Sequence, residues 1–306
     1  MVRSGKRCDI CGRPAAYVQR YSGTSLCERC FTKTIRRRVW REISRNHLMR
    51  VGERVVFAVS GGKDSVACLD IVHRLGRRRR VEMAVLTIDE GISGYRPKGI
   101  EKARAAAEER NLEFQLASFR EAFGRGLDSI LREKGVTERS CTYCGVLRRW
   151  LLNKTAREMG ADKLVTGHNL DDEIQSALLN MVRGDPARIA RSGPSYILDH
   201  PKFVPRVKPL RRIPGRETLV YDLFNDLDVH LGSCPYSEFD MRNVIRGFFN
   251  RLEETRPTSK NSFLSTVDRL AEQIRASYEG YRLSECTVCG EPAAGRVCKA
   301  CQLLGS

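Results

Sequence analysis

The segment VVFAVSGGKDSVACLDIV, residues 55–72, most constrains the fold, because it places a glycine-rich turn between an apolar run and a helix-like run. Gly61 and Gly62 let the backbone approach an anion, and the first turn of the following helix presents its N–H groups to it. A Walker loop would have a glycine where this chain has Phe57. The segment therefore predicts a strand, a phosphate-binding loop of another kind, and a helix.

The side chains of this turn suit a polyphosphate. Ser60 and Ser65 add hydroxyl groups, and Lys63 adds a point charge. Asp64 is unusual beside a phosphate, and a carboxylate there indicates a bridging Mg²⁺. The alternative is an ordinary Gly-Gly turn with a helix cap. The run SGGKDS holds more hydroxyl and charged residues than such a turn needs, so we favour the phosphate loop.

Strand-like and helix-like segments alternate after this loop. We expect strands at 54–59, 81–89, 112–118 and 162–167, and helices at 63–75, 98–111, 119–134, 144–159 and 170–182. This alternation predicts an α/β fold with a Rossmann-like parallel sheet and helices on both faces, which binds ligands at the carboxyl ends of its strands.

Other segments flank this pattern. We expect a basic amphipathic helix within 31–50, a turn at 77–80, and a long loop at 184–215, where Gly and Pro are frequent. Helices return at about 216–227, 237–254 and 260–278.

The positive charge is concentrated in two segments. The net charge is +17, and residues 1–50 hold 13 Lys and Arg against 3 Asp and Glu. Residues 183–217 hold 9 against 3. Concentrated charge of this kind favours a polyanionic partner, most simply nucleic acid, over the alternative of a solvated basic face.

Eight of the twelve cysteines form two sets of paired CxxC motifs. The first set is Cys8, Cys11, Cys27 and Cys30, and the second is Cys286, Cys289, Cys298 and Cys301. Each CxxC turns two thiolates toward one point, and two such turns complete a tetrahedral site for structural Zn²⁺. Redox disulfides are the alternative. We therefore predict zinc knuckles near both ends of the chain.

Four cysteines remain. Cys68 lies in the helix-like run after the glycine turn and is most simply a small buried hydrophobe. Cys141, Cys144 and Cys234 leave three thiols, and three thiols suit an iron–sulfur cluster with one open iron. A third zinc site completed by a histidine, or a disulfide-forming pair with Cys234 as a spectator, fits the spacing equally well.

These features divide the chain into four parts. We expect an N-terminal zinc finger with a basic helix at 1–50, an ATP-binding catalytic domain at 51–255, a helical linker at 256–285 and a C-terminal zinc finger at 286–306. No run approaches the ~18 consecutive apolar residues of a membrane span, and the N-terminus is unlike a signal peptide. We therefore expect a soluble, cytoplasmic protein with no membrane partner.

SGGKDS resembles the PP-loop of the ATP pyrophosphatase superfamily. The motifs DEGISGYR, CTYCGVLRR, VTGHNLDDE, LLNMVRGDPARIARS and CPYS, with the cysteine knuckles, resemble those of the tRNA 2-thiouridine synthetases over essentially the whole chain. The resemblance implies an enzyme that splits ATP into AMP and pyrophosphate, adenylylates the C2 oxygen of a tRNA uridine and replaces that oxygen with sulfur.

The resemblance also implies roles for single residues. The ATP site would comprise Ala58, Val59, Ser60, Gly61, Gly62, Lys63, Asp64, Ser65, Ile88 and Gly167. Asp172, Lys63 and Arg148 match catalytic positions, and Cys141, Cys144 and Cys234 match the ligands of a 4Fe–4S cluster whose fourth iron would hold the sulfur. Arg148 stands where one branch has a lysine; arginine keeps a charge for phosphate but does not transfer protons.

The resemblance leaves the target and the partners open. The motifs look closer to the archaeal and eukaryotic branch, which modifies the wobble uridine, than to the branch that modifies the T-loop ribothymidine. A ubiquitin-like sulfur carrier thiocarboxylate or inorganic sulfide would supply sulfur, and the family suggests a homodimer. A non-catalytic, zinc-containing tRNA-binding protein is the alternative of another class, but Lys63, Asp64 and Asp172 are all present.

Overall fold

A computed structural model describes residues 5–76, 80–196, 200–277 and 283–305. Its main sheet has six strands in the order β5-β4-β3-β6-β8-β7. The strands are β3 (Arg54–Ala58), β4 (Glu82–Asp89), β5 (Glu113–Ser118), β6 (Lys163–Thr166), β7 (Ser195–Tyr196) and β8 (Arg206–Val207). All neighbours pair in parallel except β7, which runs antiparallel to β8. The predicted parallel sheet is confirmed.

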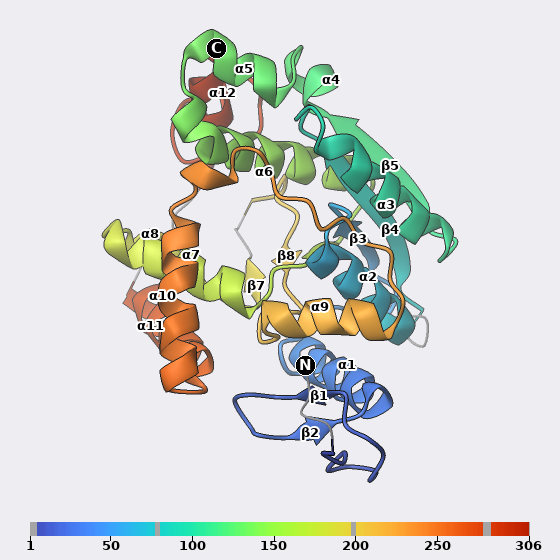
Figure 1. Cartoon of the computed structure of the whole chain (residues 1–306). Coiled ribbons are helices and arrows are strands. Elements are labelled where there is room, and N and C mark those ends of the chain that lie inside the picture. The colour runs from blue at the N-terminus through green and yellow to red at the C-terminus, as the bar shows by residue number, and fades with distance from the viewer. Residues whose placement is uncertain (1–4, 77–79, 197–199, 278–282, 306) are drawn as a thin grey trace.

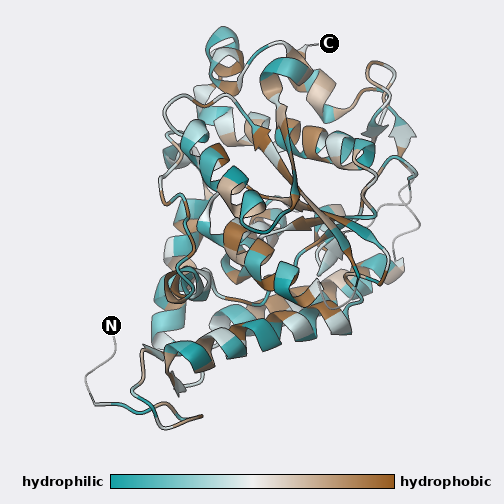
Figure 2. Cartoon of the chain, turned by 90° about the vertical axis from the view of Figure 1, so that its right-hand side faces the viewer, coloured by the Kyte–Doolittle hydropathy of each residue, from teal (hydrophilic) through white to brown (hydrophobic). Residues whose placement is uncertain are grey.

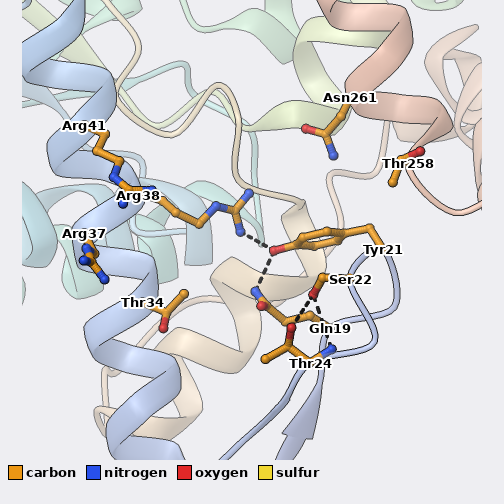
Figure 3. Close-up of a pocket in the computed structure, with 10 residues that line it drawn as sticks. All are labelled: Gln19, Tyr21, Ser22, Thr24, Thr34, Arg37, Arg38, Arg41, Thr258 and Asn261. Carbon is orange, nitrogen blue, oxygen red and sulfur yellow. Dashed lines mark hydrogen bonds between the residues drawn. The ribbon is translucent and has the colours of Figure 1, made fainter. Parts of the chain in front are cut away.

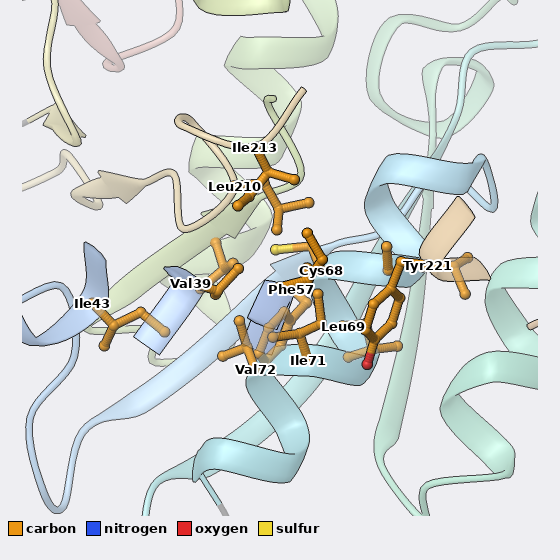
Figure 4. Packing of buried hydrophobic residues seen from close by; sticks show 14 of the residues in the cluster. Val39, Ile43, Phe57, Cys68, Leu69, Ile71, Val72, Leu210, Ile213 and Tyr221 are labelled. Carbon is orange, nitrogen blue, oxygen red and sulfur yellow. The ribbon is translucent and has the colours of Figure 1, made fainter. Parts of the chain in front are cut away.

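The sheet separates two cores, because successive strand residues point to opposite faces. Val55 and Phe57 of β3 face one core, and Val56 between them faces the other. Figure 4 shows Phe57 against residues of the helix that follows the glycine turn, such as Leu69 and Val72. Burial on both faces explains the near-continuous apolar run of the strand, and Figure 2 shows the strands largely in the colour of hydrophobic residues.

Helices cover both faces, as expected for this fold class (Figure 1). The first core contains residues of α1 (Glu28–Arg45), α2 (Lys63–Gly76), α3 (Arg96–Glu108) and α9 (Gly215–Phe224). The second contains residues of α4 (Phe119–Phe123), α5 (Leu127–Lys134), α6 (Ser140–Glu158) and α12 (Lys299–Leu304). A third cluster joins α7 (Leu170–Val182), α10 (Arg242–Thr255) and α11 (Ser259–Ser277).

Three local expectations were wrong in detail. The segment 184–215 is not one long loop, since it contains α8 (Pro186–Ala190), β7 and β8, and elements this short show no periodicity. The helix expected at 119–134 is two helices, because Gly124 takes a φ of 76° and ends the first. The helix expected at 144–159 begins at Ser140, so it includes both cysteines of the CTYC motif.

The two cysteine knuckles lie at opposite ends of the molecule (Figures 1 and 2). The N-terminal one combines the hairpin of β1 (Tyr17–Val18) and β2 (Ser25–Leu26) with the start of α1. The C-terminal one contains β9 (Ser284–Glu285), β10 (Pro292–Ala293) and α12. It is anchored to α6, where Arg157 donates a hydrogen bond of 3.0 Å to Glu291.

The strand order sets the place for a ligand. The chain passes from β3 to β4 on one side, and β6 pairs with β3 on the other. The carboxyl end of β3 is therefore the point where the direction of winding reverses, the usual ligand position in such sheets. None of the helices in the described part of the chain is long and apolar enough to cross a membrane. Of the expected turn at 77–80, residues 77–79 lie outside the described residues.

Candidate active site and metal centres

The glycine turn after β3 is held closely by its neighbours. Gly61 has a φ of 80°, and a Cβ atom there would lie 1.9 Å from the carbonyl oxygen of Gly99. The N–H of Ser60 donates to the hydroxyl of Ser65 over 3.2 Å, and that hydroxyl donates to the carbonyl of Gly62 over 2.8 Å. A side chain at position 61 would both strain the backbone and displace α3. The loop therefore has the form of an anion cradle.

The end of β6 closes against this loop. A Cβ atom at Gly167 would lie 2.7 Å from the carbonyl oxygen of Asp64. On another side, the N–H of His230 donates to the carbonyl of Gly61 over 2.8 Å. The structure thus places Gly167 beside the phosphate loop, and its contact with a nucleotide stays a prediction. It adds His230, which lies outside the motifs and was not predicted.

Lys63 is engaged within the protein. Its Nζ lies 2.7 Å from the carboxylate of Asp64, 3.0 Å from the carbonyl oxygen of Gly215 and 3.2 Å from the hydroxyl of Thr218. The Thr218 hydroxyl also donates to Asp64. A phosphate group arriving in the loop would therefore compete with Asp64 for the lysine. Sequence reasoning missed Thr218, because it lies on α9, far along the chain, outside any motif.

Asp172 lies in the first turn of α7, near the same loop. It forms a capping box with Asn169, in which each backbone N–H donates to the other side chain over 3.1 Å. Burial and then the charge of Asp64 raise the pKa of Asp172 to about 6. The expected catalytic carboxylate is therefore within electrostatic range of the loop.

A third carboxylate, Asp222 of α9, was not foreseen. It is 1% exposed, and neither of its oxygens has a hydrogen-bond partner among the described residues. Burial and then the charge of Asp64 raise its pKa to about 8. Asp172 and Asp222 are thus each within electrostatic range of Asp64, although the three carboxylates do not all lie within 4.8 Å of one another, unlike the sulfur atoms of the cysteine sets. Carboxylate oxygens of this kind suit Mg²⁺, and Asp64 is the one that the phosphate loop itself carries.

Cations gather around His168, which follows β6. Desolvation by the surrounding protein, and then the charge of Lys208, lower the pKa of His168 to about 3, although the residue is solvent-accessible. Arg149 has its pKa lowered to about 10 by the same two kinds of effect. The cations that act on one or both groups are Arg148, Arg188, Arg206, Lys208 and Arg242. These side chains come from four separate segments and make the edge of the sheet suited to anions.

A chain of polar contacts leads from the phosphate loop toward the three thiols. Arg96 is buried, donates to the carbonyl of Ser60 over 2.9 Å and pairs with Glu90 at 2.6 Å. Its Nε also donates to the carbonyl of Ile88 over 2.9 Å. Arg148 lies 3.4 Å from Glu90 on the other side, and the charges of Cys144 and then Glu90 raise the pKa of Arg148.

The three thiols lie near one another. Cys141 and Cys144 stand on the first two turns of α6, and the Cys141 thiol lies 3.9 Å from the carbonyl oxygen of Tyr236, two residues after Cys234. Burial and then the charge of Asp240 raise the pKa of Cys141, and the charge of Cys234 adds to this. Their sulfur atoms do not all lie within 4.8 Å of one another, unlike those of the two four-cysteine sets. A cluster places each thiolate on a different iron, so this wider arrangement fits a cluster better than a single ion.

Each four-cysteine set is ready to hold one ion. In both sets all four sulfur atoms lie within 4.8 Å of one another. Cys11 and Cys27 approach to 3.5 Å, and Cys289 and Cys298 to 3.6 Å. Four sulfur donors around one point are the donor set of a structural zinc site. Cys68 belongs to neither set and is buried in the first core, as expected.

Comparisons with known proteins match this arrangement. A family model described as a PP-loop domain matches residues 32–203. A second model, described as the N-terminal LIM domain of the 2-thiouridine synthetase TtuA, matches residues 7–32. The two matches cover the phosphate loop and the first cysteine knuckle, respectively.

Relatives align over nearly the whole length. The tRNA 2-thiolation protein NcsA of Haloferax volcanii is 38% identical, with 98% of this chain and 98% of that protein covered. The cytoplasmic tRNA 2-thiolation protein 1 of Drosophila melanogaster is 32% identical, with 96% and 85% covered. A solved structure, the U34-tRNA thiolase NcsA from Methanococcus maripaludis with its [4Fe-4S] cluster, superposes with a TM-score of 0.83 at 36% identity, covering 97% of this chain and 95% of that one.

Proposed function

The chain belongs to the PP-loop family of tRNA 2-thiolation proteins, and we propose that it replaces the C2 oxygen of the wobble uridine of tRNA with sulfur. It is an ATP-dependent tRNA thiolation enzyme. The observation that carries the proposal for this chain is the path Ser60–Arg96–Glu90–Arg148, which connects the phosphate loop with the helix of Cys141 and Cys144. Activation by ATP and delivery of sulfur would then occur at one edge of the sheet.

The first stage activates the uridine. The C2 oxygen of uracil is a poor leaving group, so it must first be activated. In this step the oxygen attacks the α-phosphorus of ATP, and the bond from that phosphorus to pyrophosphate breaks. The glycine turn and Ser65 would hold the phosphates. Lys63 would exchange its contact with Asp64 for one with phosphate, and Asp64 would bind Mg²⁺. Asp172, ionised above a pH of about 6, would orient the reacting groups.

The second stage exchanges oxygen for sulfur. A sulfur nucleophile attacks C2, and the bond between C2 and the oxygen of the departing AMP breaks. Cys141, Cys144 and Cys234 would bind a 4Fe–4S cluster, which when bound supplies an open iron for the sulfur. Arg148, between Glu90 and Cys144, would contact a phosphate during this exchange, because its charge is permanent.

Binding of tRNA would use the positive segments. The cations around His168 lie at the reaction edge, and the N-terminal 50 residues add a second positive region. The two four-cysteine sets would each bind Zn²⁺ and so hold small segments that lack a large core. The protein would act in the cytoplasm, the location in the name of the Drosophila melanogaster relative. It would form a homodimer and take its sulfur from a sulfur carrier thiocarboxylate or from sulfide.

The choice of the wobble uridine rests on two points. The motifs noted in the sequence look closer to the wobble branch, and the Methanococcus maripaludis protein bears U34 in its name. The same chemistry on the T-loop ribothymidine is the alternative within the family. The alternative of another class is a zinc-containing tRNA-binding protein without catalysis. Such a protein would not carry out the first stage and would form no AMP.

One experiment tests target and chemistry together. Anaerobically prepared protein is incubated with unmodified tRNA, ATP and sulfide, and RNase fragments are analysed by mass spectrometry. We expect a gain of sulfur in the anticodon fragment and AMP formation that depends on tRNA. Sulfur in the T-loop fragment would show that the target is the T-loop ribothymidine. AMP formation that does not depend on tRNA, with no sulfur in any fragment, would overturn the proposed function.

A further inference from the structure

A second polar pocket lies at the N-terminal end of the molecule, apart from the phosphate loop. It has a volume of about 490 Å³ and lies between the β1–β2 hairpin, α1 and the first turn of α11 (Figure 3). The N-terminal residues 19–41 and the distant start of α11 therefore form one hollow. Figure 1 shows α9 between the N-terminal unit, which comprises the β1–β2 hairpin and α1, and α2, which begins at the phosphate loop. The reaction described above makes no use of the pocket.

Two arginines on its wall carry uncompensated charge. Arg37 and Arg41 are exposed and, within the described part of the chain, neither takes part in an ion pair. They stand about one helical turn apart on α1, so they project from the same side of the helix with Cα atoms ~6 Å apart along the axis. The residues that line the pocket include no Asp or Glu. An anion in the hollow would therefore meet positive charge without a competing carboxylate.

The pocket also presents a fixed aromatic ring. The hydroxyl of Tyr21 accepts hydrogen bonds from Arg38 over 2.5 Å and from Gln19 over 2.6 Å, and donates to Glu217 over 3.1 Å. Arg38 lies over the ring at 5.3 Å and pairs with Glu217 at 2.6 Å. Its charge is thus matched within the protein, so Arg38 holds Tyr21 in place and leaves anion binding to its neighbours. Figure 3 shows this group facing Thr258 and Asn261 across the hollow.

The rest of the lining is neutral and forms hydrogen bonds. Thr34, Thr258 and Asn261 offer two hydroxyl groups and an amide. A phosphodiester suits the two arginines, a ribose suits the hydroxyl groups, and a base suits the amide and the ring edge. These three chemical parts occur together, at this size, in a single ribonucleotide.

We propose that this pocket binds one nucleotide of tRNA other than the uridine that is modified. Arg37 and Arg41 hold its phosphate, and Tyr21 with Asn261 contacts its base or ribose. The inference rests on the proposed function for the identity of the RNA. Because α9 separates the pocket from the phosphate loop, the two sites hold different parts of the same tRNA and together set which uridine reaches the loop.

The test compares two double variants with equal loss of charge. Arg37→Gln/Arg41→Gln removes the pocket cations, and Arg120→Gln/Arg132→Gln removes two exposed arginines of α4 and α5, at the other end of the molecule (Figure 1). The affinity for tRNA is measured over a range of salt concentrations. We expect the pocket variant to bind more weakly and its salt slope to fall by ~1–2, because up to two phosphate contacts are lost. The control should keep the wild-type slope, and both should bind ATP normally.

A crosslink locates the nucleotide. A photoreactive benzoylphenylalanine in place of Ser22, at the rim of the pocket, is irradiated with bound tRNA and the crosslinked position is sequenced. We expect one main position, distinct from the thiolated uridine, and its loss in the Arg37→Gln/Arg41→Gln protein. Wild-type protein that binds no tRNA would contradict the proposed function. Wild-type protein that binds and thiolates tRNA, with a pocket variant of equal affinity and salt slope, would overturn only the pocket.

Discussion

Glu217 and Thr218 are adjacent on α9, yet their side chains contact two different sites. Glu217 is 1% exposed and accepts hydrogen bonds from Gln19 and Arg38 of the N-terminal unit over 2.8 and 2.6 Å. Thr218 is fully buried and lies 3.2 Å from Nζ of Lys63 in the phosphate loop. A single turn of helix thus fixes both the tRNA pocket and the lysine of the nucleotide site.

Glu217→Gln should weaken the attachment of the N-terminal unit. The substitution keeps the shape but leaves Arg38 without its carboxylate, and a hydrogen bond to a charged group contributes about 1.5–3 kcal/mol. We expect the free energy of unfolding in urea to fall by about that amount. The exposed Glu254→Gln is the control. Equal unfolding free energies for the two variants would contradict the prediction.

Asp222 should make stability depend on pH. The folded protein keeps a proton on Asp222 up to a pH of about 8, whereas the unfolded chain loses it near pH ~4. Between these values unfolding releases a proton, so stability falls as the pH rises, by at most about 1.4 kcal/mol per unit. Asp222→Asn should remove this loss.

The measurement is urea unfolding at several pH values. We expect the variant to gain stability over the wild type progressively from pH 5 to pH 8, with Asp226→Asn, an exposed neighbour, as the control. A constant difference between Asp222→Asn and the wild type across this range would show that the carboxyl group does not titrate as stated.

Asp172 should set the acid limb of AMP formation. Its pKa of about 6 means that the carboxylate is present above that pH and protonated below it. The rate of tRNA-dependent AMP formation should therefore fall as the pH drops through about 6. Asp172→Asn should give a low rate without this limb, although an asparagine oxygen can still accept the N–H of Asn169. If the Asp172→Asn variant kept the same fall in rate at low pH as the wild type, another group would be responsible for the titration.

Arg148 should act through its charge. A charge-assisted hydrogen bond lost in the transition state lowers a rate by about tenfold or more, so we expect Arg148→Gln to show at least this loss in thiolation. Arg148→Lys should keep more of the rate than Arg148→Gln, because it retains the charge. A lysine variant faster than the wild type, with a new limb in its pH profile, would instead assign proton transfer to this position.

Cys234→Ser should separate activation from sulfur transfer. We expect wild-type protein prepared without oxygen to carry about two zinc and about four iron per chain. The variant should keep zinc and ATP binding, lose iron and make no thiouridine. Asp64→Ala should keep both metals but form neither AMP nor thiouridine. Normal thiolation by Cys234→Ser would favour a persulfide on Cys141 or Cys144.

Much of the fold could be read from short-range patterns. The strand, turn and helix around SGGKDS were predicted correctly, because glycine conformation and helix periodicity act within a few residues. The two CxxC sets are equally local, since their spacing brings sulfur atoms together over a short loop. Asp172 was expected only from the resemblance, and its capping box with Asn169, which spans four residues, is equally local. The ligands of the cluster stay a prediction.

Tertiary structure alone decided the environment of these groups. Thr218 and Asp222 reach the phosphate loop because α9 packs on α2, and the cations that act on His168 and Arg149 converge from four segments. β8 has two residues, too few for any periodic signal, and becomes a strand because β6 offers it an open edge. Contacts of this kind depend on the packing of elements far apart in the chain. A sequence pattern with a period of two or 3.6 residues does not predict these contacts, because it reports only which face of one element is buried.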